Sequence, residues 1–217
     1  MAKTTRTTRE QLVYAAGELF AELGFDGVST RMIAEKAGIT LGSIHYHFGS
    51  KKNLYLEAFS YALEEKRCNG FLEVLEENPR LVEQPTGQAE LIRTAVYRNF
   101  HEYFRAEKPR WERQILVREL VTPSSAIPLI VERFFKPDME ATRQFYRKIK
   151  PGAGDKEINT WMDILHGQIF FYSAIEEVLD LVRGEEISDV AFYREAARTV
   201  SRAMITFLDL PLPKDLQ

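Results

Sequence analysis

Apolar residues recur at helical spacing along most of this chain, and no stretch follows the two-residue period of a strand. The first run is preceded by Thr7 and Glu10, which have the spacing of a capping box, as do Thr8 and Gln11. Gly24 ends the run, since glycine takes a positive φ without steric cost. The apolar stripe of this predicted first helix comprises Leu12, Ala16, Leu19, Phe20 and Leu23.

Proline and glycine divide the rest of the chain into further helical segments. The breaks fall at 78–87, at 108–109, at 151–154 and at Gly184. Between them the spacing predicts helices over 50–77, 88–107, 110–121, 125–149, 155–183 and 188–208. The tail with Pro211 and Pro213 is expected to be extended. The sequence therefore predicts an all-α fold.

Residues 29–48 predict two short helices joined by a tight turn. Ser29 is a good N-cap for the first, and Gly38 suits its end. In the second, Ile44 and Phe48 lie four residues apart and point it back onto the first. The spacing of a small residue at Ala34, a glycine at 38 and a branched residue at 44 is typical of a helix-turn-helix.

The second helix of this pair has an unusual outer face. It carries hydroxyls, an apolar residue, imidazoles and a phenol, at Thr40, Leu41, Ser43, His45, Tyr46 and His47. A helix held from behind by its neighbour can enter a DNA major groove. The alternative is an αα-hairpin packed in a core, but such a hairpin has no need of this outer face.

Two lysines follow at the start of the next helix. Ser50 can cap that helix, and Lys51 and Lys52 lie in its first turn, where their charge opposes the helix dipole. The free backbone amides of this first turn and the two lysine side chains together predict a contact with a phosphate group. The alternative is an ordinary solvated helix start.

Composition narrows the class of protein. The chain has 217 residues, 45% hydrophobic and 28% charged, which allows one or two domains with a real core. No apolar run reaches the roughly 18 residues that span a bilayer, and residues 1–9 are basic rather than a secretory signal. The single cysteine, Cys68, excludes internal disulfides and multi-cysteine metal sites and suits the cytoplasm. We expect no cofactor and no metal.

The charge is unevenly distributed. The formal net charge is −3, but residues 1–56 carry seven Lys/Arg and five Asp/Glu, whereas the remainder carries 22 and 27. The basic end is thus the end with the predicted helix-turn-helix. This is the sign that contact with DNA phosphates requires.

The two C-terminal segments, 155–183 and 188–208, are apolar around much of their circumference. Such helices are buried on most sides, so they can form a four-helix bundle with a second copy of the chain. A twofold dimer would present two recognition helices roughly 34–36 Å apart. The alternative is that both helices are internal core.

Residues 8–56 resemble the DNA-binding domain of the TetR family of bacterial transcriptional regulators. The residues that carry the resemblance are Ala15-Ala16, Leu19-Phe20, Gly24-Phe25, Ser29-Thr30, Ile33-Ala34, Ala37-Gly38-Ile39-Thr40, Gly42, Ile44, Tyr46-His47-Phe48, Lys51 and Leu54. The resemblance implies a helix-turn-helix DNA-binding domain over residues 1–50, with an N-terminal arm at 1–7. It also implies a helical effector-binding and dimerisation domain over 51–217.

The resemblance also implies roles for single residues. Thr30 and Lys51 would hold phosphates, as Tyr46 and His47 often do in the family. Thr40, Leu41, Ser43 and His45 would lie nearest the base edges, where Leu41 can pack on a thymine methyl. His45 departs from the pattern, because the family usually has tyrosine at that position.

Residues 85–208 are similar to the C-terminal domain of a CerR-like subgroup of this family. Arg118-Glu119-Leu120 with Pro123-Ser124, and His166-Gly167-Gln168 with Phe171-Tyr172, carry this likeness. Family logic places a small-molecule effector among these helices. Candidate pocket residues are polar or aromatic side chains on apolar helices, namely His101, Tyr103, Trp111, Arg118, Glu119, His166, Gln168 and Tyr172. Each can instead have a purely structural partner or face the dimer seam.

The sequence as a whole is interpreted as a homodimeric cytoplasmic regulator that binds an operator in double-stranded DNA. We expect a repressor that is released from a palindromic operator by a small molecule. Two alternatives are a helical adaptor that has lost DNA binding and an enzyme that modifies small molecules. Tyr46, His47, Phe48 and Lys51 argue against the adaptor. The absence of a phosphate loop, a nucleophile elbow and a zinc-protease motif argues against the enzyme.

Overall fold

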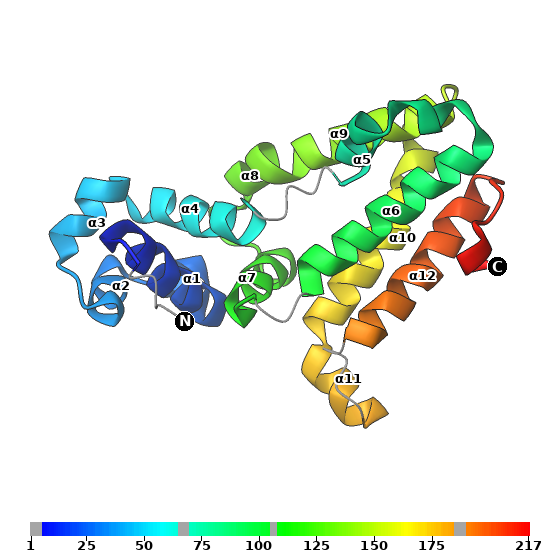
Figure 1. Cartoon of the computed structure of the whole chain (residues 1–217). Helices are drawn as coiled ribbons and strands as arrows, with labels where there is room; N and C mark the ends of the chain where they lie inside the picture. Colours follow the sequence, from blue (N-terminus) through cyan, green and yellow to red (C-terminus); the bar gives the residue numbers. More distant parts are fainter. Residues whose placement is uncertain (1–5, 65–69, 105–107, 185–189) are drawn as a thin grey trace. The chain divides into compact units, whose positions relative to one another are not determined.

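The computed structural model describes residues 6–64, 70–104, 108–184 and 190–217, and these residues contain helices and turns but no strand. The predicted all-α fold is confirmed (Figure 1). Cys68 and residues 1–5 of the predicted arm lie outside the described residues. The α-helices are α1 Thr8–Gly27, α2 Thr30–Ala37, α3 Leu41–Phe48, α4 Lys51–Glu64, α5 Gly70–Glu77, α6 Pro85–Phe104, α7 Arg110–Val121, α8 Ile127–Ile130, α9 Lys136–Ile149, α10 Asp155–Ala174, α11 Glu176–Arg183 and α12 Val190–Phe207. Shorter elements are the 3-10 helices Pro79–Glu83 and Lys214–Leu216 and the π-helix Val131–Phe135.

The chain forms two compact units. Residues 1–65 and 109–133 make the first unit, and residues 66–108 with 134–217 make the second. The first unit thus joins α7 and α8, from the middle of the chain, to the N-terminal helices. These units are defined by packing, whereas the division predicted at residue 50 separates a DNA-binding domain from an effector-binding domain. That functional division stays a prediction.

The core of the first unit is built on α1. Leu12, Ala16 and Phe20 are fully buried, as the apolar stripe predicts. Leu23 was expected on the same stripe but is 40% exposed. The helix kinks at the next residue, Gly24, where φ is 74°, and Phe25 beyond the kink is buried in the core. Gly24 therefore ends the main run of the helix, and one short turn follows.

A close contact fixes α7 against α1. A Cβ added to Gly17 on α1 would lie 2.4 Å from the indole ring of Trp111, so only a glycine fits there. The indole also stacks on Tyr61 of α4 at 5.9 Å and meets the edge of Tyr14 at 5.4 Å between ring centroids. α7 is thereby a rigid part of the unit that holds α2 and α3.

In the second unit, α6, α10 and α12 pack side by side (Figure 1). Trp161 of α10 is fully buried at the centre, and its indole N–H donates to the Met204 carbonyl of α12 at 3.0 Å. Phe145 and Tyr146 of α9 and Phe71 of α5 pack around the same indole. This aromatic cluster ties four helices together.

The structure differs from the sequence prediction in several places, one of which is the start of α6 at Pro85, inside the break expected over 78–87. The helix expected over 155–183 is interrupted at Ile175, whose φ of −126° and ψ of 24° separate α10 from α11. Part of the helix expected over 125–149 takes the wider π-helical hydrogen-bonding pattern, at Val131–Phe135. The tail, expected to be extended, ends in a 3-10 turn that buries Leu216 completely. None of the described helices is long and apolar enough to cross a membrane.

Candidate DNA-binding interface

The turn between α2 and α3 is built by two local devices. The Ser29 hydroxyl accepts from the amide of Met32 at 3.2 Å and caps α2 at its start. Gly38 closes α2 with φ 65° and ψ 30°, the left-handed conformation that glycine adopts freely. The Ile39 amide then donates back to the Ala34 carbonyl at 3.0 Å. The chain thus reverses within a few residues and starts α3 in a defined direction.

α3 is anchored from behind and open in front. Ile44 and Phe48 are buried, as their four-residue spacing predicts. On the other side Leu41 is 44% exposed and Tyr46 is 86% exposed. A tyrosine ring held almost wholly in solvent on a rigid helix is suited to contact with a partner surface.

The polar side chains of α3 are held locally. The hydroxyls of Thr40 and Ser43 lie 3.0 Å apart, and Nδ1 of His45 lies 3.3 Å from the Gly49 carbonyl. The rings of Tyr46 and His47 meet edge to face at 4.9 Å. None of these contacts uses Nε2 of His45. Together they restrict the rotamers of these side chains before a partner binds.

Lys51 has a role that its position in the sequence did not indicate. Its ammonium group donates to the carbonyls of Phe25 and Val28 at 2.9 and 2.8 Å, and it lies 4.3 Å from the centroid of the Phe25 ring. Lys51 therefore ties the first turn of α4 to the last turn of α1 and to the loop that precedes α2. The neighbouring Lys52 is exposed, as is Arg31 in the first turn of α2.

The candidate effector residues do not gather in one place. Trp111, Arg118 and Glu119 belong to the first unit, whereas the other five lie in the second. Trp111 is the ring that packs on Gly17. The guanidinium Nε of Arg118 lies 3.0 Å from where a Cβ on Gly24 would be, beside the kink in α1.

Glu119 is a buried carboxylate at the junction of α4 and α7. It is 2% exposed and accepts from the Tyr55 hydroxyl at 2.6 Å and from the amide and hydroxyl of Ser124 at 3.1 and 2.9 Å. Burial, followed by the bond to Glu119, raises the pKa of the Tyr55 phenol well above its usual range. The phenol therefore keeps its proton and serves as a donor that joins α4 to α7.

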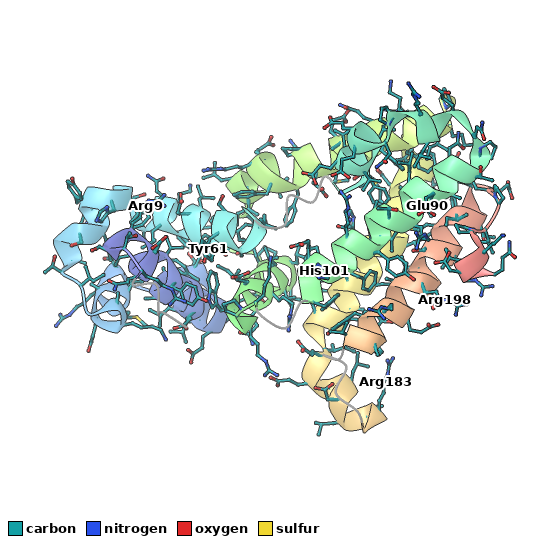
Figure 2. The ribbon with its side chains drawn as sticks, in the orientation of Figure 1. Arg9, Tyr61, Glu90, His101, Arg183 and Arg198 are labelled. Carbon is teal, nitrogen blue, oxygen red and sulfur yellow. The ribbon has the colours of Figure 1, made fainter. Side chains whose placement is uncertain are left out.

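The candidates of the second unit lie in separate places. Gln168 and Tyr172 line a groove of 280 Å³ between α10 and α12. His101 lies near the end of α6 (Figure 2). It lines a different cavity, of 500 Å³. Tyr103 is half-buried beside that end of α6, and Nε2 of His166 lies 3.8 Å from Oδ2 of Asp138 on α9. None of the eight has been tested as an effector contact, so their predicted role stays a prediction.

Within the described ranges no group of three or more His, Cys, Asp or Glu side chains is placed to hold a metal ion.

Comparison with protein families gives two matches that together span most of the chain. Residues 12–58 match the model for bacterial regulatory proteins of the tetR family. Residues 89–209 match the C-terminal domain of the HTH-type transcriptional dual regulator CecR, so the subgroup name is CecR and not CerR.

Curated relatives are regulators as well. The chain is 27% identical over 208 residues to the HTH-type transcriptional dual regulator CecR of Shigella flexneri, covering 94% of this chain and 91% of that protein. It is 36% identical over 83 residues to the HTH-type transcriptional repressor AcnR of Corynebacterium glutamicum, which covers 38% of this chain and 41% of the relative.

Solved structures share the fold. A TerR/AcrR-family transcriptional regulator of Aquifex aeolicus superposes with a TM-score of 0.63 at 20% identity, covering 91% of this chain and 99% of the other. AmtR of Mycobacterium smegmatis gives a TM-score of 0.62 at 17% identity, with 99% and 92% covered.

Proposed function

Since the chain belongs to the TetR family of bacterial transcriptional regulators, we propose that it represses transcription by binding a palindromic operator as a homodimer. The general part of this function, regulation of transcription through DNA binding, follows from the family. The repressor role, the operator contacts and release by a small molecule are the proposal.

One observation carries the proposal: α3 presents Tyr46 and Leu41 to solvent from a helix that Ile44 and Phe48 hold rigidly. A helix fixed in this way can lie in a major groove without further ordering cost. The hydroxyls of Thr40 and Ser43 and the imidazole of His45 suit the base edges, and Leu41 suits a thymine methyl.

Phosphate contacts flank this face. We assign them to Thr30, Tyr46 and His47 and to the exposed Lys52. Lys51 contributes less directly, because two of its three N–H donors are already engaged by main-chain carbonyls. It keeps one donor for a phosphate and holds the loop before α2 in place.

Dimerisation is assigned to α10 and α12. These helices border the groove lined by Gln168 and Tyr172, and Phe171, on the adjoining face of α10, remains 43% exposed. An exposed aromatic ring beside a groove favours burial against a second copy. The family supports dimeric assembly, and the proposed DNA target supports a cytoplasmic location.

The adaptor and enzyme alternatives have weaker support. An adaptor without DNA binding has no use for a solvent-exposed Tyr46 next to exposed Lys52 and Arg31. For the enzyme, the relatives named above are transcriptional regulators, so we propose no catalytic activity.

The test is a binding titration with a duplex that the chain itself enriches from random DNA. Tyr46→Ala should weaken binding at least about tenfold, because an exposed ring assigned to a phosphate contact is lost from α3. The matched control is Leu181→Ala on α11, which also removes an exposed apolar side chain, 85% exposed, and should leave affinity unchanged. Equal affinity of the Tyr46→Ala variant and the unaltered chain would exclude α3 as the docking face.

A further inference from the structure

The second unit contains a cavity of 500 Å³ between α6 and α12. These two helices lie side by side, and the label of His101 marks the end of α6 on which several lining residues lie (Figure 2). The volume is within the roughly 300–1,000 Å³ that small-molecule sites occupy. The cavity is distinct from the groove between α10 and α12.

The inner wall of the cavity is aromatic. The rings of Phe104 and Tyr193 are stacked, with centroids 3.9 Å apart and planes only 8° from parallel. Phe100 and Ala197 are buried beside them and complete an apolar surface. Such a surface favours a flat or elongated apolar body.

Most charges at the rim are already neutralised. The Arg93 guanidinium donates to Glu90 and, at 3.1 Å, to Asp215, and both terminal nitrogens of Arg98 donate to Glu77. The one acidic lining residue, Glu102, has the ammonium of Lys108 at 3.9 Å and Nδ1 of His101 at 3.5 Å.

Arg194 is different. Its side chain lines the cavity and is exposed, and within the part of the chain that the structure describes it makes no hydrogen bond or ion pair. Its planar fork of N–H donors matches a carboxylate or sulfonate in a bidentate arrangement. The apolar wall therefore suits an apolar body, and the one uncompensated guanidinium at its edge suits an anionic group on the same ligand.

We propose that this cavity binds an amphipathic organic anion, with its acidic group on Arg194 and its apolar body against the Phe104–Tyr193 pair. The proposal that the anion binds here is argued from the cavity alone. The proposal that this anion is the effector rests on the proposed function. Neutral and cationic compounds of the same shape bind less well, because they leave Arg194 without a partner.

The cavity and the proposed dimer groove use different faces of α12. Arg194 and Ala197 line the cavity, whereas Thr199 and Ala203 line the groove. At about 100° per residue these pairs point in nearly opposite directions from the helix axis. A second copy seated on the groove therefore leaves the cavity open.

The experiment compares two fluorescent probes on the full chain. One is 1-anilinonaphthalene-8-sulfonate, and the other is N-phenyl-1-naphthylamine, which has the same rings without the sulfonate. Each is titrated against the unaltered chain, Arg194→Gln, and the control Arg202→Gln, which removes an exposed arginine of α12 outside the cavity. The ratio of the two dissociation constants isolates the contribution of the anionic group.

Arg194→Gln should weaken sulfonate binding about fivefold and leave binding of the neutral probe unchanged. Arg202→Gln should change neither. Thr94→Trp, which adds an indole to the α6 wall of the cavity, should weaken both probes. An unchanged ratio in Arg194→Gln, or full binding of both probes to Thr94→Trp, would overturn the proposal.

A DNA titration with and without the sulfonate probe separates this inference from the proposed function. Release of the duplex by the probe in the unaltered chain, but not in Arg194→Gln, supports the cavity as an effector site. No DNA binding at all would overturn the proposed function and leave the probe ratios, and hence the binding site, standing. Binding of DNA with no response to bound probe would overturn the effector role.

Discussion

Lys51 and Lys52 are adjacent in the sequence and have opposite surroundings. The ammonium of Lys51 is held by two main-chain carbonyls, whereas Lys52 is exposed. Lys51→Met should lower the free energy of unfolding by about 1.5–3 kcal/mol, since charge-assisted hydrogen bonds to two carbonyls are lost. Lys52→Met should change stability by less than about 0.5 kcal/mol and instead reduce the salt dependence of DNA binding by about one unit of slope.

Urea unfolding and salt-dependent DNA titrations of both variants check this assignment. Equal stability of the two variants would contradict the structural role of Lys51. The adjacent lysines also mark a limit of sequence interpretation. Ser50 predicts the helix start, but the carbonyls that Lys51 contacts lie at the end of α1, more than 20 residues earlier, and no local pattern reports such a contact.

Asp138 makes the stability of the chain depend on pH. Burial raises the pKa of its carboxyl to about 7, and its Oδ1 has no hydrogen-bond partner. The folded chain therefore holds a proton that the unfolded chain releases near pH 4, so stability should fall as pH rises from about 4 to 7 and then level off. The neighbouring Nε2 of His166, 3.8 Å away, does little to oppose this effect, because burial lowers the pKa of the imidazole and favours its neutral form.

Asp138→Asn should remove this dependence. The free energy of unfolding is measured by urea unfolding at pH 5 and at pH 8. From pH 5 to pH 8, the value for the variant should rise by about 2 kcal/mol relative to the value for the unaltered chain. Asp209→Asn, an exposed change just beyond α12, is the control and should gain nothing. A pH profile identical in the Asp138→Asn variant and the unaltered chain would show that this carboxyl is ionised throughout.

At the scale of elements, α7 is the helix whose partner could not be predicted. Its helical span, 110–121, followed from apolar spacing and matches the structure. Its place against α1 depends on Gly17 meeting Trp111, two residues 94 positions apart. Helical periodicity describes which face is apolar but not which helix covers it. The same holds for Ile175, where α10 ends without a glycine or proline to mark the break.

Gly17→Ala tests that contact. The added Cβ would lie 2.4 Å from the Trp111 ring, so the variant should be less stable by about 1–3 kcal/mol despite the higher helix propensity of alanine. In a Trp111→Leu background the same change should cost nothing or stabilise slightly. Gly42→Ala, in the same unit with nothing within 4 Å of the added Cβ, is the control. Equal losses in both backgrounds would rule out the indole as the cause.

At the scale of the whole molecule, the fold class and the helix-turn-helix followed from the sequence, because capping residues, glycines and apolar spacing act locally. The candidate effector residues could not be sorted in the same way. Trp111 and Glu119 looked like pocket residues on an apolar helix, yet both have partners within the first unit. Arg194 carried no local signal, since its meaning depends on a cavity formed with α6.

The central claim is that two copies of α3 recognise one DNA site. Its most direct test is selection of bound duplexes from a random pool with purified chain at physiological salt. The account predicts an enriched palindrome with half-sites about one helical turn apart, 10–10.5 base pairs or a multiple of it. It also predicts that Tyr46→Ala enriches this palindrome much more weakly from the same pool. Enrichment of an asymmetric site, or no enrichment by a folded dimer treated to remove any bound anion, would contradict it.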